Sequence, residues 1–170
     1  MAVRTDSEAL EVRGAPPCDL LIRRGHVLTM DAARTVFSPG AVAIAGRSIA
    51  AVGPDDSIRS QFNASQTIDA DGSIVHPGFV DAHYHVTMHT TRGAIADKPG
   101  GTAGDARASF GGFVEWFNAQ DDADEFASAQ LACLEMARNG VTCFMEPGTA
   151  FAPDAVANAV ERVEIGRAHV

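Results

Sequence analysis

The sequence predicts an α/β fold in which a small β-rich region precedes the start of a parallel β/α barrel. Two observations lead to this expectation. Short β-type runs separated by turn residues fill residues 19–75, and from residue 77 onward the order is strand, loop, helix, strand, helix. A complete (β/α)₈ barrel needs about 250 residues. A chain of 170 residues therefore holds either a smaller fold or the front part of a longer barrel protein.

Four segments are expected along the chain. Residues 1–17 are a polar leader, residues 18–76 the N-terminal part of a β-sandwich domain, and residues 77–164 the first two β/α units of a TIM-like barrel. Residues 165–170 read Ile-Gly-Arg-Ala-His-Val, which equals the translation of a common sequencing adapter, ATC GGA AGA GCA CAC GTC. We expect this last segment to be adapter-derived and to contribute nothing to the fold.

The β-rich region is expected to form a small antiparallel sandwich of five or six short strands. Within it, the Asp71-Gly72 turn lies between two β-type runs and favours a two-residue hairpin. After the first barrel strand, the composition of residues 90–112 indicates a long loop, and Glu115-Trp116-Phe117 begins a short helical segment.

The strongest helix signal covers residues 122–138. Asp122 as N-cap and Glu125 three positions later resemble a capping box, and Asn139-Gly140 supplies the stop. The expected helical stripe consists of Phe126, Gln130, Cys133, Leu134 and Ala137, with Leu131 beside it. Residues 141–145 read as a buried strand, and residues 153–163 as a second amphipathic helix with Pro153 in its first turn.

Composition and charge exclude several classes of protein. The net charge is −9 and the 13 basic residues form no cluster, so nucleic-acid and anionic-membrane binding lack electrostatic support. No apolar run reaches the roughly 18 residues of a membrane span, and no signal-peptide pattern is found. We expect a cytoplasmic protein with a small-molecule substrate, and a homo-oligomeric parent remains open. Cys18, Cys133 and Cys143 show no ligand-like spacing; the last two are expected to be buried apolar residues.

The feature that points to function is the run Pro-Gly-Phe-Val-Asp-Ala-His-Tyr-His at residues 77–85. In a strand, residues i and i+2 point to the same face, so His83 and His85 can present both imidazoles to one ion. Imidazole is a good ligand for Zn²⁺ and similar divalent ions. A bare His-x-His pair is weak evidence, because surface strands carry such pairs by chance.

This run resembles the first barrel strand of the amidohydrolase superfamily, which typically reads P-G-[FLIV]-[VI]-[DN]-x-H-x-H. The next residues, His85-Val86-Thr87-Met88, then Thr91-Arg92-Gly93 and Val114-Glu115-Trp116-Phe117, are similar to one branch of it. That branch includes S-adenosylhomocysteine/methylthioadenosine deaminases, guanine deaminases and triazine chlorohydrolases.

The resemblance implies a metal-dependent hydrolase that acts on carbon–nitrogen (non-peptide) bonds, by deamination or dechlorination of a heteroaromatic ring with hydroxide held on the metal. His83 and His85 would be ligands of one divalent ion, zinc or iron. The remaining ligands and the general acid/base would lie beyond Val170. This chain alone is therefore expected to be inactive.

Four further residues are candidates for substrate binding: Arg92, Trp116, His89 and Glu146. Arg92 and Trp116 could line a pocket for a planar ring, or anchor a loop and pack in the core. His89 is expected to be an exposed loop histidine more readily than a substrate ligand. Glu146 could face the pocket, whereas Asp81 is expected to support the metal strand or cap a turn.

The alternative interpretation is a non-catalytic fragment, or a small β-domain binding module whose His-x-His is incidental. The two hypotheses differ in the sequence that they expect after residue 164. A later barrel-strand histidine and a late aspartate would support the enzyme.

Overall fold

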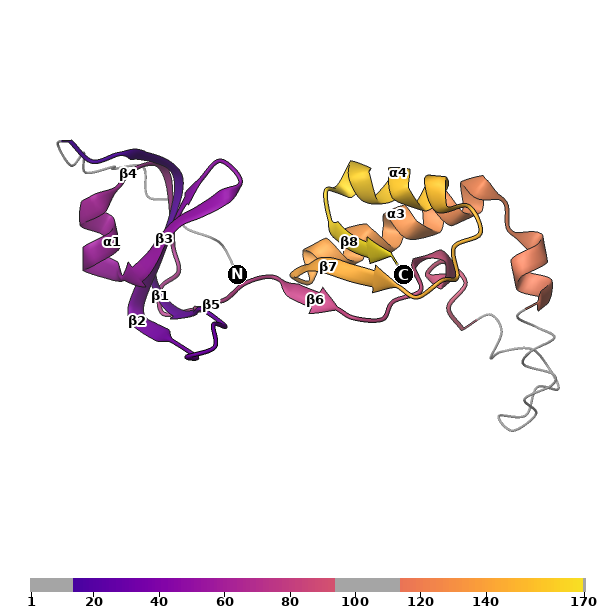
Figure 1. Cartoon of the computed structure of the whole chain (residues 1–170), viewed down its shortest axis with the longest axis horizontal. Helices are drawn as coiled ribbons and strands as arrows, with labels where there is room; N and C mark the ends of the chain where they lie inside the picture. The colour runs from indigo at the N-terminus through magenta and orange to yellow at the C-terminus, as the bar shows by residue number, and fades with distance from the viewer. Residues whose placement is uncertain (1–13, 94–113, 170) are drawn as a thin grey trace. The chain divides into compact units, whose positions relative to one another are not determined.

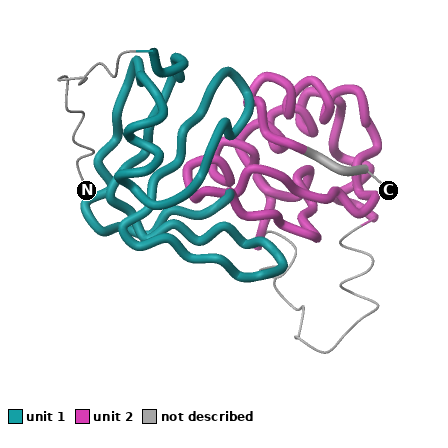
Figure 2. Tube along the Cα trace, turned by 60° about the vertical axis from the view of Figure 1, so that its left-hand side comes forward, with its two compact units in different colours: residues 1–77 teal, residues 78–170 magenta. Residues whose placement is uncertain are grey.

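The structure is a computed structural model, and it describes residues 14–93 and 114–169 (Figure 1). The chain divides into two compact units, residues 1–77 and residues 78–170 (Figure 2). Most of the expected leader and most of the expected loop at residues 90–112 fall outside the described residues. Across the two described ranges, no helix is long and apolar enough to cross a membrane.

The first unit is built on one mixed sheet. Its elements are β1 (Pro17–Leu28), β2 (Val36–Ala45), β3 (Ser48–Pro54), α1 (Asp55–Gln61), β4 (Asn63–Asp69) and β5 (Ile74–Val75). The strand order is β3-β2-β1-β4, and β5 pairs with the second half of β1. The buried core consists of Cys18, Leu21, Ala41, Ala43 and Ile58. Helix α1, which the expected strand order lacks, contributes Ile58 to this core.

The expected antiparallel pairing holds for β1, β2 and β3 and is wrong for β4 and β5, which both run parallel to β1. The expected hairpin at Asp71-Gly72 is also wrong. These two residues do form a turn with positive φ, but the Gly72 N–H donates to the Arg24 carbonyl of β1 at 2.9 Å. The turn therefore links two strands that both run in the direction of β1.

The second unit alternates strands and helices as expected. Its elements are β6 (Phe79–Asp81), the 3-10 turn η1 (Val86–Met88), a helical stretch at residues 114–119, α3 (Asp122–Arg138), β7 (Val141–Glu146), α4 (Pro153–Val163) and β8 (Gly166–His169). The three strands are parallel in the order β6-β7-β8, with α3 and α4 on one side of the sheet (Figure 1). This is the arrangement expected for the start of a β/α barrel, and the described strands do not close one.

Helix α3 has the expected bounds but a different cap and a different buried face. The N-cap is Asp121, whose side chain accepts from the Asp124 N–H at 2.9 Å, so the capping box lies one residue earlier than expected. The buried positions are Glu125, Ser128, Ala129, Ala132, Cys133 and Met136. Leu131 and Leu134 are exposed. Small side chains on the buried face let α3 lie close to its neighbours.

The expectation that residues 165–170 contribute nothing to the fold is wrong. Ile165 is only 8% exposed and belongs to the core of the second unit. Residues 166–169 form β8, which pairs in parallel with β7 from Cys143 to Glu146. The adapter origin of the segment stays a prediction. The thiol of Cys133 is buried as expected, whereas Cys143 is only half-buried.

Candidate metal centre

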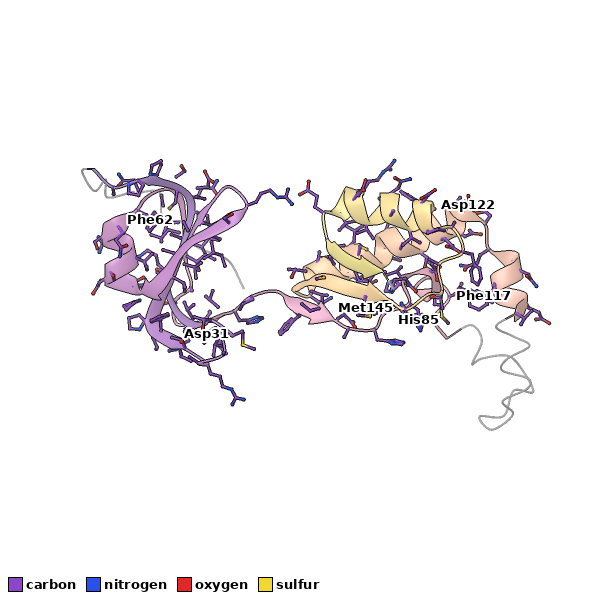
Figure 3. The ribbon with its side chains drawn as sticks, in the orientation of Figure 1. Asp31, Phe62, His85, Phe117, Asp122 and Met145 are labelled. Carbon is purple, nitrogen blue, oxygen red and sulfur yellow. The ribbon has the colours of Figure 1, made fainter. Side chains whose placement is uncertain are left out.

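The two histidines come directly after β6. The strand ends at Asp81, so His83 and His85 lie in the segment after it. Asp81 Oδ1 accepts from the His83 N–H at 3.1 Å, which is the turn-capping contact expected of it. The Tyr84 N–H donates to the Met145 carbonyl of β7 at 3.0 Å, and this bond holds the segment beside β7, where Figure 3 labels His85 and Met145.

The imidazoles of His83 and His85 converge. Their Nε2 atoms lie 3.2 Å apart, and the rings meet edge-on with centroids 4.9 Å apart. With Zn–N bonds of about 2.0–2.1 Å, nitrogens at this separation subtend an angle of about 100° at the ion, close to tetrahedral geometry. The pair therefore fits two positions of a zinc site. No third His, Cys, Asp or Glu joins them among the described residues.

Glu146, at the end of β7, organises the segment that carries His85. Its side chain is buried, with 2% of the residue exposed. Oε2 accepts from the Val86 N–H at 3.0 Å, and Oε1 accepts from the N–H groups of Gly148 and Thr149 at 3.1 and 2.8 Å. Both carboxylate oxygens bind the chain itself, which favours an organising role over the substrate contact considered from the sequence.

Thr149 joins His85 to Glu146. His85 Nδ1 lies 2.8 Å from Thr149 Oγ1, and Thr149 Oγ1 lies 2.9 Å from Glu146 Oε1. The direct distance from His85 Nδ1 to Glu146 Oε1 is 3.8 Å, beyond hydrogen-bond reach. The hydroxyl therefore bridges the imidazole and the carboxylate.

His89 is buried, so the expectation of an exposed loop histidine is wrong. It is 4% exposed, and its ring lies between the Tyr84 hydroxyl, 2.6 Å from Nδ1, and Glu135 Oε2, 3.1 Å from Nε2. Arg92 binds the same Glu135 oxygen at 3.2 Å, and this hydrogen bond lowers the pKa of the Glu135 carboxyl. Burial raises the pKa of the Tyr84 hydroxyl. These contacts tie the loop to α3 and favour anchoring for both His89 and Arg92.

Trp116 lies in the helical stretch at residues 114–119, in agreement with the helical segment expected there. Its ring packs edge-on against Phe117 at 4.6 Å, and Phe117 packs against Phe151 at 4.8 Å. Its buried Nε1 atom has no hydrogen-bond partner within the described part of the chain. Trp116 thus belongs to an aromatic cluster, and its Nε1 donor is unused by the residues that the structure describes.

Two further buried side chains support the site and have no signal in the sequence motif. Ser128 of α3 places its Oγ 2.9 Å from both the Val86 and the Thr87 carbonyls, and so fixes η1 immediately after His85. Glu125 of α3 accepts from the N–H groups of Phe151 and Ala152 at the start of α4. Ser128 and Glu125 therefore hold the two loops that carry His85 and Thr149.

Comparison with known proteins gives two sequence relatives of particular use. A 5-methylthioadenosine/S-adenosylhomocysteine deaminase of Syntrophobacter fumaroxidans is 37% identical over 141 residues, which cover 78% of this chain and 29% of the relative. A 5'-deoxyadenosine deaminase of Methanosarcina mazei is 32% identical over 151 residues, covering 84% of this chain and 31% of the relative. No family model matches the chain.

Solved structures show the same fold. An adenosine deaminase from Xanthomonas campestris with bound zinc has a TM-score of 0.68 and 25% identity, over 90% of this chain and 34% of that one. An atrazine chlorohydrolase from Arthrobacter aurescens complexed with zinc has a TM-score of 0.68 and 24% identity, over 89% of this chain and 35% of that one.

These findings define the class: the chain has a fold similar to part of amidohydrolase-type barrel proteins, about a third of their length. The predicted resemblance to the deaminase and chlorohydrolase branch is confirmed, and the named sequence relatives are 5-methylthioadenosine/S-adenosylhomocysteine and 5'-deoxyadenosine deaminases. The chain spans about 30% of the length of these relatives.

Proposed function

We propose that the chain is the N-terminal part of a metal-dependent hydrolase that deaminates a heteroaromatic ring, with dechlorination as the related alternative. The observation that carries this proposal is the convergence of His83 Nε2 and His85 Nε2 to 3.2 Å just after the first barrel strand. Active sites of β/α barrels lie at this carboxyl end of the strands. The deaminase relatives support an adenosine-like substrate. We also propose that the enzyme is cytoplasmic.

His83 and His85 would hold one divalent ion, with zinc favoured by its presence in two solved structures of this fold and iron as the alternative. A bound ion lowers the pKa of a water molecule towards about 7 and so supplies a nucleophile at neutral pH. The chain's own residues hold and orient the ligands: Asp81 fixes the turn at His83, and Thr149 contacts His85. Further ligands and a general acid/base would come from the rest of the protein.

Among the other candidates, we propose Trp116 as the residue for contact with a planar ring. It is half-buried beside Phe117, and its Nε1 is the unused donor described above. Arg92 and His89 are already engaged with Glu135, so their proposed role is to anchor the loop after η1.

The test is carried out on the protein encoded by the gene with its continuing reading frame. Ammonia release from 5-methylthioadenosine, S-adenosylhomocysteine and 5'-deoxyadenosine is measured beside chloride release from atrazine. His83→Ala and His85→Ala should each abolish turnover and reduce bound zinc. His26→Ala, which removes an exposed histidine of the first unit that is bonded to Ser38, is the matched control and should retain both.

Wild-type zinc content and rate in the His83→Ala, His85→Ala double variant would refute the metal assignment. That result would favour a non-catalytic binding module with an incidental histidine pair.

A further inference from the structure

We propose that Thr149 and Glu146 set the tautomer of His85, so that its proton stays on Nδ1 and its Nε2 lone pair faces His83. The two are positioning residues for the metal ligand. The proposal deepens the proposed function, because it concerns the same histidine. The tautomer itself results from contacts within the second unit and is independent of the reaction that the whole protein catalyses.

The direction of each hydrogen bond is determined by the groups involved. A carboxylate only accepts, and Glu146 accepts from the backbone N–H groups of Val86, Gly148 and Thr149 as well as from the Thr149 hydroxyl. A hydroxyl carries one proton, and that of Thr149 is donated to Glu146 Oε1 at 2.9 Å. Towards His85, Thr149 Oγ1 can therefore only accept, so His85 Nδ1 is the donor at 2.8 Å.

A neutral imidazole that carries its proton on Nδ1 has a free lone pair on Nε2. This is the atom that lies 3.2 Å from His83 Nε2. The hydrogen bond at Nδ1 also fixes the rotation of the ring, which is the usual effect of a partner at the second nitrogen of a metal-binding histidine. Thr149 thereby determines both which nitrogen of His85 is available and where it points.

The bridge is held in a loop whose backbone is tied down by side chains that are themselves buried. Thr87, which is 0% exposed, donates its hydroxyl to the Thr149 carbonyl at 3.1 Å. Glu125 binds the N–H groups of Phe151 and Ala152 just beyond Thr149. The backbone is thus held at Thr149 itself and just after it, and the Thr149 hydroxyl cannot turn away from His85 without breaking the bond to Glu146.

The test compares wild type, Thr149→Val and Thr149→Ser. Valine removes the hydroxyl and keeps the branched shape, whereas serine keeps the hydroxyl. In the metal-stripped protein with ¹⁵N-labelled histidine, at a pH about 1.5 units above the ordinary histidine pKa of about 6.5, two-bond ¹⁵N–¹H correlation spectra report which nitrogen carries the proton. His85→Ala identifies the His85 signals.

Wild type and Thr149→Ser should show His85 protonated on Nδ1, and Thr149→Val should shift it to Nε2 or to a mixture. Zinc affinity, measured with zinc chloride in competition with a chelator, should fall about 10–100-fold in Thr149→Val and stay near wild type in Thr149→Ser. An Nε2-protonated His85 in wild type overturns the proposal, and so does a Thr149→Val protein with unchanged tautomer and affinity. If Thr149→Val does not fold, the position of the His85 proton in the wild-type protein still tests the proposal.

The outcome separates this inference from the proposed function. If His85 is protonated on Nδ1 and Thr149→Val has the expected effects, but the protein releases no ammonia or chloride, the inference about the tautomer stands and the proposed reaction is refuted. If the protein deaminates its substrate but His85 is protonated on Nε2 in the metal-free form, the proposed reaction stands and the inference about the tautomer is refuted.

Discussion

Replacing Glu125 by glutamine should destabilise the second unit, although the change is isosteric. At the N-terminus of α4, Phe151 N–H donates to both oxygens of the buried carboxylate at 3.1 Å, and Ala152 N–H donates to Oε2 at 2.9 Å. An amide can offer only one oxygen, and its NH₂ group would face a backbone donor. A hydrogen bond to a charged group contributes about 1.5–3 kcal/mol, and we expect the free energy of unfolding to fall by about that amount.

Urea unfolding monitored by intrinsic fluorescence measures this loss of stability in the second unit. The chain has one tryptophan and one tyrosine. Both Trp116 and Tyr84 lie in the second unit, so the signal reports on that unit alone. With an m-value of about 1–3 kcal/mol/M, the midpoint should fall by about 1 M. The matched control is Glu161→Gln, an exposed carboxylate on α4, which should stay within about 0.5 kcal/mol of wild type. Equal midpoints for Glu125→Gln and this control would refute the capping argument.

Three further predictions concern stability. Burial raises the pKa of the Cys133 thiol from 9.0 to about 11. The unfolded chain therefore loses this proton first, so the free energy of unfolding should fall as the pH rises from 9 towards 11, and Cys133→Ala should remove that slope in pH-dependent urea titrations. A Cβ at Gly78 would overlap Thr142, so Gly78→Ala should cost about 1–3 kcal/mol and lower the melting temperature by roughly 5–20 °C; an unchanged melting temperature would contradict it. Because Ile165 is part of the core, Ile165→Ala should cost about 2–5 kcal/mol, whereas no loss in urea unfolding would restore the expectation that residues 165–170 are foreign to the fold.

Local patterns predicted the second unit well. The bounds of α3 and α4 agree with the expected helices, because apolar spacing, Pro153 and Asn139-Gly140 are local signals. The cap of α3 is off by one residue because Asp121 and Asp122 each have an acidic residue three positions later. A tertiary contact makes Asp121 the N-cap. The Glu125 side chain binds the backbone at the start of α4, so it is not available for a capping box with Asp122.

Local sequence patterns do not predict contacts between residues that are far apart in the chain. Thr149 and His85 are 64 positions apart, and no periodicity connects a loop threonine to a strand-end histidine across that distance. Local patterns do not predict the parallel pairing of β4 and β5 with β1 for the same reason: Asp71-Gly72 gives a local turn signal, whereas the strand direction depends on pairing with the distant β1. No local pattern predicts that His89 is buried, because its partner Glu135 lies on α3, far along the chain.

The two buried carboxylates around the loop after β7 take almost all their partners from peptide N–H groups. Dissolved ions weaken the attraction between mobile surface charges, with a screening length of about 8 Å at physiological ionic strength. The exposed ion pairs of Arg24 with Asp69 and Asp71 are open to that effect. Glu125 and Glu146 are buried and bind fixed peptide N–H groups, so salt should weaken their hold on the loop much less than it weakens those surface pairs. The orientation of His85 should therefore depend only weakly on ionic strength.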